Sequence, residues 1–221
     1  FYGAPVTKAA VIVVSGLSVL TSVYRLKPLL YLQLVPHLTV HRQYWRLLTS
    51  GVAFSSTGET LFGALLFYHC RVVERQYGSA KYASMLVVTS VLATALEIAA
   101  LAVARPIGLH YIPSGPYGMV FATLYQLYAG LPCAYRFSLL GGTFSDKSLL
   151  YLLGLQLMIS HWPGSMAAGL CGILAGVIYR TNLLGMKRWR FPGFIRRFTA
   201  RLFLPIFGSR PARRSNHTLP E

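Results

Sequence analysis

Charged residues are scarce in this sequence of 221 amino acids, and acidic residues are the rarest. Only 12% of the residues are charged, with five Asp and Glu against 21 Lys and Arg, whereas 54% are hydrophobic. A soluble domain usually has about 25% charged residues. This composition argues against a soluble globular protein and indicates a chain that lies largely within a membrane.

Cysteine is also rare, with three residues, Cys70, Cys133 and Cys171. They stand singly in or beside apolar segments, so their spacing fits neither a disulfide framework nor a zinc site. We interpret them as small buried hydrophobic residues. We expect no bound metal and no cofactor.

What the sequence does contain is a series of long apolar stretches. Lipid requires every backbone amide to be paired internally, which favours helices, and a full crossing takes about 20 residues. The predicted fold class is an all-α membrane protein with six transmembrane helices, at residues 9–24, 52–70, 82–104, 114–135, 148–162 and 165–180. We interpret the first as a retained span rather than a cleavable signal, because a basic Tyr24–Lys27 segment ends it and no cleavage pattern follows.

The net charge of +16 raises the question of nucleic-acid binding. However, the ten Lys and Arg residues between Arg180 and Arg214 directly follow the last apolar stretch, where basic residues report orientation and contact anionic lipid. We therefore expect phospholipid contacts and no nucleic acid. Six spans place both termini on one side, which holds sixteen Lys and Arg against five on the other side. Both termini are thus predicted to be cytosolic.

The predicted domain organisation has three parts: a membrane domain at 1–182, a basic amphipathic segment at 183–207 and a disordered tail at 208–221. In the second part, apolar residues alternate with bases at helical spacing, which predicts a helix on the cytosolic leaflet. Its membrane-surface bases are Lys187, Arg188, Arg190, Arg196, Arg197 and Arg201. The far-side segment 25–50 is apolar but broken by prolines and histidines, so we expect it in the interface, with Trp45 at headgroup depth.

Three short motifs, in order along the chain, resemble those of the rhomboid superfamily. The segment YWRLLT at 44–49 is similar to the WR motif of the first rhomboid loop, through Trp45 and Arg46. The segment ERQYGSAK at 74–81 is similar to the ExxxGS element; it contains Glu74, Arg75, Gly78 and Ser79. The resemblance implies a hydrogen-bond network of Glu74 and Arg75 at the cytosolic end.

The third motif, PSGPYG at 113–118, is similar to the GxSG region in which rhomboid proteases keep their nucleophilic serine, here Ser114. Those proteases also carry AHxxGxxxG in the sixth span, and the segment AGLCGILAG at 168–176 matches it except that Gly169 replaces the histidine. A serine needs an adjacent base to attack, so the resemblance implies a pseudoprotease. We expect neither His110 nor His161 to act as the base, and we expect Ser114 to cap the fourth span.

Small residues in the sixth predicted span repeat at helical spacing, at Ser165, Gly169, Gly172 and Gly176. Such residues let helices approach closely in lipid. The resemblance implies that the partner is the fourth span, at Ser114, Gly115 and Gly118.

Glu97 lies deep in the third predicted span, where a carboxylate is costly. Two interpretations stay open: contact with a client helix or lipid, and a structural role as either a hydrogen-bond partner of a neighbouring span or a protonated acid near the lumenal end.

The segments 68–87, 112–115 and 147–160 are most similar to rhomboid pseudoproteases that carry a ubiquitin-associated domain. This branch includes the rhomboid subunit of the fungal Dsc ubiquitin-ligase complex; derlins are similar more distantly. The family's ubiquitin-associated domain is expected after the basic segment but is not recognisable among these residues.

The resemblance implies a catalytically inactive subunit of a membrane E3 ubiquitin-ligase complex in endoplasmic-reticulum, Golgi or endosome membranes. It would recognise membrane-protein clients for ubiquitination and extraction, together with a RING-type ligase and a UBX-domain adaptor that links to an AAA unfoldase. The short fifth and sixth spans also predict local membrane thinning, because 14 apolar residues cover only about 21 Å of a roughly 30 Å core. An active serine protease using Ser114 and a lipid-handling protein are the alternatives.

Overall fold

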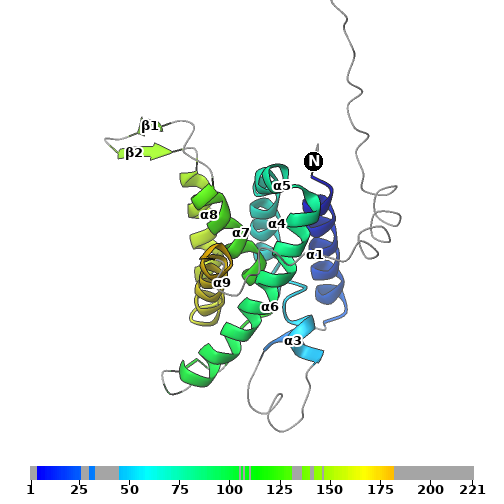
Figure 1. Ribbon diagram of the computed structural model, residues 1–221. Helices are drawn as coiled ribbons and strands as arrows, with labels where there is room; N and C mark the ends of the chain where they lie inside the picture. The colour runs from blue at the N-terminus through cyan, green and yellow to red at the C-terminus, as the bar shows by residue number, and fades with distance from the viewer. Residues whose placement is uncertain are drawn as a thin grey trace, which may run out of the picture.

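A computed structural model describes residues 4–25, 30–32, 45–104, 106, 108–109, 111–130, 136–139, 142–145 and 147–181. Its helices are α1 (Pro5–Val23), α3 (Trp45–Thr49), α4 (Thr57–His69), α5 (Arg71–Tyr77), α6 (Ser79–Ala104), α7 (Tyr117–Gly130), α8 (Ser148–Ile159) and α9 (Gly164–Thr181). Two strands, β1 (Arg136–Leu139) and β2 (Gly142–Ser145), lie between α7 and α8. Figure 1 shows a helical bundle with the N-terminus and the hairpin at one end and α3 at the other.

The helical membrane-protein class is confirmed, and α1, α4, α6, α7, α8 and α9 occupy the six predicted ranges. Three of them, α1, α6 and α9, are long and apolar enough to cross a membrane by length and composition. The other three are short: α4 has 13 residues, α7 has 14 and α8 has 12. The count of six membrane crossings therefore stays a prediction.

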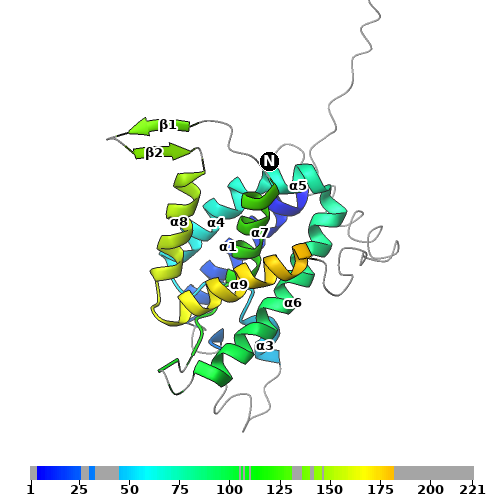
Figure 2. The same ribbon diagram turned by 60° about the vertical axis from the view of Figure 1, so that its left-hand side comes forward.

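The helices differ strongly in length, which Figure 2 makes visible in the long slanted α6 and the short α8. At about 1.5 Å per residue, the 26 residues of α6 extend for roughly 39 Å, whereas the 12 of α8 extend for about 18 Å. The 13 residues of α4, which packs against α8, extend for only about 20 Å. One side of the bundle is thus built from two short neighbouring helices.

Two bounds and one element differ from the predictions. Helix α4 begins at Thr57 rather than near residue 52, and α7 covers Tyr117–Gly130 rather than 114–135. After α7, β1 and β2 pair as an antiparallel hairpin in which Arg136 faces Ser145. The sequence RFSLLGGTFS at 136–145 contains the signal for it, because a glycine pair separates two short runs with aromatic and β-branched residues. The purely helical prediction did not include this hairpin.

Helix α9 packs mainly against α7 and α6, which makes these three helices the centre of the bundle. Large buried side chains fill the space around them, among them Tyr82, Tyr117 and Phe121. Helix α1 packs against α4 on the other side of the bundle. The contacts between α7 and α9 bring two of the predicted motifs together.

Several predictions fall on residues outside the described ranges. They are the amphipathic helix at 183–207, the tail at 208–221 and most of the interfacial segment 25–50. From that segment, α3 is present and Leu32 pairs with Ile112 in an isolated antiparallel bridge. Cys70 and Cys171 are buried free thiols, as predicted, and Cys133 lies outside the described residues.

Candidate functional site: motifs, glycine contacts and a buried carboxylate

Glu74, from the ExxxGS-like motif, completes the first turn of α1. Its side chain is fully buried and accepts three hydrogen bonds: Val6 N donates to Oε1 at 3.0 Å, and Thr7 N and Thr7 Oγ1 each donate to Oε2 at 2.7 Å. The residue before α1, Ala4, has no side chain that could cap it. The first amides of a helix have no partner within the helix and attract negative charge. A carboxylate from α5 therefore caps α1 across the bundle.

The remaining residues of this motif shape the connection from α5 to α6. Gly78 follows α5 with φ of 79° and ψ of 145°, a conformation that only glycine adopts readily. Its amide donates to Glu74 O at 2.8 Å and its carbonyl accepts from Tyr82 N at 2.9 Å. Ser79 opens α6 directly after this turn. Arg75, the next residue of α5, is exposed.

The WR-like motif forms the short helix α3. Arg46 is buried, and its Nη1 donates to Tyr31 O at 3.3 Å, while its guanidinium also lies 5.5 Å from the Trp45 ring centre. Trp45 itself is half exposed. Arg46 thus fixes the segment around Tyr31 to α3.

Ser114 does not cap a helix, so that prediction was wrong. Helix α7 begins at Tyr117, and the buried Ser114 Oγ has no hydrogen-bond partner among the described residues. The chain here is held by its backbone, because Gly115 N donates to Ser50 O at 2.8 Å. Gly115 is tightly packed, since a Cβ there would lie 2.7 Å from Phe54 and 2.6 Å from Tyr117.

The position that matches the rhomboid base, Gly169, has no room for a side chain. A Cβ on Gly169 would lie 2.9 Å from Met158 Cγ and 3.2 Å from Phe121 Cε2. Its nearest neighbours therefore come from α8 and α7 rather than from Ser114. An imidazole at this position would require Met158 and Phe121 to move.

Gly172 and Gly176 bring α9 against α7. A Cβ on Gly172 would lie 3.1 Å from Gly118 Cα, and one on Gly176 would lie 3.1 Å from Ala122 Cα. Gly118 in turn lies against α6, where its Cβ would meet that of Ala93 at 2.4 Å. Small residues on three helices thus allow the close approach expected in lipid.

Polar contacts support the same packing in the half of the bundle near the N-terminal end. Gln126 on α7 donates through Nε2 to Gly176 O at 2.9 Å and accepts from Tyr77 OH at 3.2 Å. One amide side chain therefore connects α5, α7 and α9.

Glu97 faces the interior from α6 and is nearly buried. It lies close enough to Cys171 on α9 and Tyr117 on α7 to interact with them electrostatically. Within the described part of the chain, no hydrogen bond to its carboxylate is present. The hydrogen bond from Glu97 to a neighbouring span that the sequence suggested is therefore not seen among the described residues.

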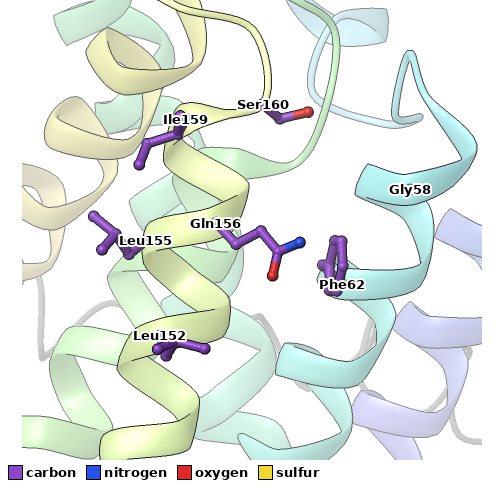
Figure 3. A pocket seen from close by; sticks show the side chains of 7 residues that line it. All are labelled: Gly58, Phe62, Leu152, Leu155, Gln156, Ile159 and Ser160. Carbon is purple, nitrogen blue, oxygen red and sulfur yellow. The ribbon is translucent and has the colours of Figure 1, made fainter.

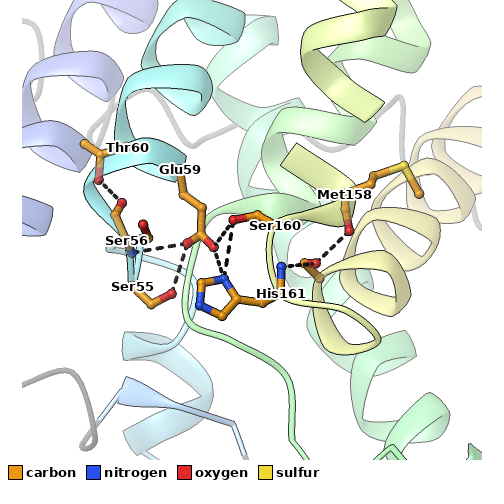
Figure 4. A network of polar contacts seen from close by, with 8 residues as sticks. Ser55, Ser56, Glu59, Thr60, Met158, Ser160 and His161 are labelled. Atoms are coloured by element: carbon orange, nitrogen blue, oxygen red, sulfur yellow. Dashed lines mark hydrogen bonds and ion pairs between the residues drawn. The ribbon is translucent and has the colours of Figure 1, made fainter. Parts of the chain in front are cut away.

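Besides Glu74 and Glu97, a third glutamate is buried, which the sequence analysis did not identify: Glu59 in the first turn of α4 (Figure 4). Ser55 Oγ and Ser56 N donate to Oε2 at 3.0 and 3.3 Å, and Ser160 Oγ donates to Oε1 at 2.8 Å. His161 Nδ1 also contacts Oε1. We call these five residues the Glu59 cluster. Its detectable sequence signal was the Ser56–Glu59 capping box, S-x-x-E before an apolar run.

His161 therefore pairs with Glu59 and not with Ser114. Ser160 Oγ and His161 Nδ1 lie 3.4 Å apart, but both groups are directed at the same carboxylate. A nucleophile would need the other ring nitrogen as its base while the acid holds Nδ1. Glu59 does hold Nδ1 of His161, but among the described residues no hydroxyl or thiol lies within hydrogen-bond distance of its Nε2. His110 lies outside the described residues.

A groove lies between α4 and α8, with a volume of about 490 Å³. It is lined by Gly58, Phe62, Leu152, Leu155, Gln156, Ile159 and Ser160. Figure 3 shows the Gln156 side chain reaching from α8 toward Phe62 on α4. Gln156 is exposed, and no hydrogen bond to its amide is present among the described residues. The groove is thus apolar except for this amide and Ser160 at one end.

The comparisons with known proteins agree with the resemblance found in the sequence. Residues 6–178 match the family described as eukaryotic integral membrane protein DUF1751. The chain is similar to rhomboid-like protein 18 of Arabidopsis thaliana, with 38% identity over 99% of this chain and 77% of that protein. It is also similar to DSC E3 ubiquitin ligase complex subunit 2 of Schizosaccharomyces pombe, with 31% identity over 85% of this chain and 51% of that protein.

A further relative is the human ubiquitin-associated domain-containing protein 2, which is 30% identical over 94% of this chain and 62% of its own length. The chain thus spans about half to three quarters of the curated relatives it matches. No solved structure matches. The chain belongs to the DUF1751 family of rhomboid-like eukaryotic integral membrane proteins.

Proposed function

We propose that this chain is a catalytically inactive, rhomboid-like subunit of a membrane-embedded E3 ubiquitin-ligase complex that recognises membrane-protein clients. The observation that carries the proposal is the similarity, over nearly the whole chain, to a DSC E3 ligase subunit and to ubiquitin-associated domain-containing protein 2. The proposed role is non-enzymatic. It consists of scaffolding the complex and presenting clients for ubiquitination and extraction.

Three structural observations support the proposed loss of protease activity. The Gly169 position has no side chain to accept a proton, and Met158 and Phe121 already occupy the space beside it. Ser114 Oγ has no described hydrogen-bond partner, and His161 is bound to Glu59. A serine without a base is a weak nucleophile.

The groove between α4 and α8 is the proposed contact for client helices. These helices are about 18–20 Å long, which is shorter than a hydrocarbon core of about 30 Å and favours locally thinner lipid. Gln156 exposes an amide to this region. An acyl chain offers no hydrogen bond at that depth, whereas a membrane helix with a polar residue does. We therefore propose clients whose membrane-spanning helix carries a hydrogen-bonding side chain.

The proposed partners are a RING-type membrane ligase and a UBX-domain adaptor that links to an AAA unfoldase. The proposed location is the endoplasmic reticulum, Golgi or endosome, with both termini in the cytosol. The excess of Lys and Arg on the terminal side supports this orientation. The bases at 187–201 are proposed to contact anionic phospholipid.

Crosslinking mass spectrometry of the native complex, purified through a tag on this chain, tests the proposal. Recovery of a RING-type multipass ligase together with a UBX protein is the expected result. In parallel, a fluorophosphonate probe should not label the chain. Labelling that disappears in Ser114→Ala, with no ligase recovered, would overturn the proposal in favour of a serine protease.

The groove is tested by a photo-crosslinking amino acid at Leu155, which lines it and is exposed, and at Leu20 on α1 as a matched control. Leu155 should capture membrane proteins that become ubiquitinated, and Leu20 should not. Equal capture at both positions, or capture of phospholipid alone at Leu155, would show that the groove is not a client contact.

A further inference from the structure

The contacts between α4 and the end of α8 converge on one side chain. Within the described ranges, the hydrogen bonds that connect α4 with Ser160 and His161, directly after α8, all end on the Glu59 carboxylate. These partners are 101 and 102 positions away in the sequence. The rest of the groove lining is apolar apart from Gln156. Glu59 therefore provides the polar connection between α4 and the residues after α8 at this end of the groove.

The hydrogen bonds to Glu59 are of the kind that a carboxylate accepts. Its side chain has no exposed surface, and Ser55 Oγ, Ser56 N and Ser160 Oγ each donate to it beside the His161 contact. A carboxylate with donors on both oxygens is suited to be ionised. The start of α4 also favours a negative charge, because Glu59 is in its first turn.

The Glu59 cluster lies at one end of the groove. Ser160 belongs to both, since it lines the groove and donates to Glu59 (Figures 3 and 4). The turn after α8 is held in shape by Ser165, whose Oγ donates to Met158 O at 2.6 Å and accepts from His161 N at 2.9 Å. The α8 side of the cluster is thus a preformed turn.

We propose that the Glu59 cluster is a releasable closure of the groove between α4 and α8, with His161 as its pH-sensitive part. This inference rests on the proposed function, because it describes the regulation of the same groove. While Glu59 holds Ser160 and His161, the helix ends stay together. When these bonds are lost, α8 separates from α4 and the groove opens toward the end opposite the N-terminus.

The effect of pH follows from the contact partners. The His161 side chain is 33% exposed, so it exchanges protons with solvent while its Nδ1 stays on Glu59. Imidazoles change charge within the pH range of cellular compartments. Protonation of the imidazole places a positive charge beside the carboxylate, so the hydrogen bond becomes an ion pair with an added Coulomb attraction. Acidification therefore tightens the closure, provided that the carboxylate stays ionised, and neutral pH loosens it.

Other titratable groups near Glu59 are two tyrosines. Tyr117 reaches it from α7, and Tyr31 from the segment before α3. Burial, then Tyr111 and the negative charge of Glu59, raise the pKa of Tyr31 above its usual value of 10.0. Phenols are neutral between pH 5.5 and 7.5, so these two tyrosines add no charge change near Glu59, and among these contact partners imidazole is the chemical class with an ordinary pKa in this range.

The closure is tested by electron-spin distance measurements between labels on α4 and α8. Leu61 and Leu155 are exposed positions on the two helices and take the labels, in a chain whose three cysteines are replaced by alanine. The full chain is reconstituted in nanodiscs at pH 5.5 and 7.5. The wild type should give a narrow distribution at pH 5.5 and an additional population at pH 7.5, longer by about 2 Å or more.

Substitutions separate the role of Glu59 from that of its partners Ser160 and His161. Glu59→Gln should give the longer population at both pH values, and His161→Gln should remove the pH dependence. Ser160→Ala and His161→Gln leave the α4 capping box intact, so they keep the test informative if Glu59→Gln does not fold. Glu97→Gln, the other buried carboxylate, is the matched control and should behave as the wild type.

Identical distances in the wild type, Glu59→Gln, Ser160→Ala and His161→Gln at both pH values would overturn the closure. Recovery of ligase partners from the native complex is measured separately. If the partners are recovered but the distances never change, this inference fails alone. If the distances change as expected but no ligase is recovered, the closure stands and the proposed function fails.

Discussion

Removing the Glu74 carboxylate should destabilise the bundle through α1. Glu74→Ala leaves the buried amide of Thr7 and the half-buried amide of Val6 without their acceptor. Each unpaired buried donor costs about 1–3 kcal/mol. We therefore expect a loss of roughly 2–6 kcal/mol in the free energy of unfolding from the two backbone amides, because the Thr7 hydroxyl also loses its acceptor but can rotate. A loss of this size is a large fraction of the stability of a domain.

The measurement is unfolding of the purified chain in mixed micelles, followed by tryptophan fluorescence. Gln76→Ala is the matched control, because Gln76 lies on the same helix but is exposed. Thr7→Val alone should cost about 1–2 kcal/mol, since it removes one of the three bonds. In the Glu74→Ala background it should cost almost nothing, because the partner is already absent.

A double-mutant cycle therefore gives a coupling of about 1–2 kcal/mol between Thr7 and Glu74. If the two substitutions are additive, or if Glu74→Ala costs no more than Gln76→Ala, the cap does not stabilise α1. The reasoning about this motif would then be wrong.

Three further substitutions test the glycine positions. Gly172→Val should force α9 away from α7 and cost about 1–3 kcal/mol in the same unfolding assay, whereas Leu170→Val on the exposed face of α9 should be nearly neutral. Gly78→Ala should cost about 1–3 kcal/mol because of its positive φ, and unchanged stability would contradict the turn. Gly169→His should lower the yield of folded protein and give no fluorophosphonate labelling; labelling that depends on Ser114 would refute the pseudoprotease proposal.

The fold class was predictable because membrane helices require long apolar stretches in the sequence. These stretches located the six helices α1, α4, α6, α7, α8 and α9, and the predicted lengths were within a few residues of the observed ones for α1, α8 and α9. The start of α4 was less predictable. Apolar residues continue before Thr57, and the actual start is determined by the capping box of Ser56 and Glu59, two polar residues within an otherwise apolar segment.

The roles of site residues were predictable only where residues close in the sequence share one helix face. Gly172 and Gly176 share a helix face by spacing alone, so their role in packing could be anticipated. The partners of Glu59 lie about a hundred positions away, and no periodicity brings Ser160 to it. Ser114 was misread for a related reason. A serine before an apolar run suggests a cap, but Pro116 and Tyr117 place the helix start two residues too late for its hydroxyl.

The cap on α1 has a consequence for how the protein is made. Thr7 receives its acceptor from a residue that the ribosome adds 67 positions later. During synthesis, the opening turn of the first helix must therefore wait, with its amides facing water or headgroups, until α5 emerges. The cap on α1 is therefore completed only after α4 and α5 have been made. The opening turn of α1 gains its acceptors later than the turns that follow it along the same helix.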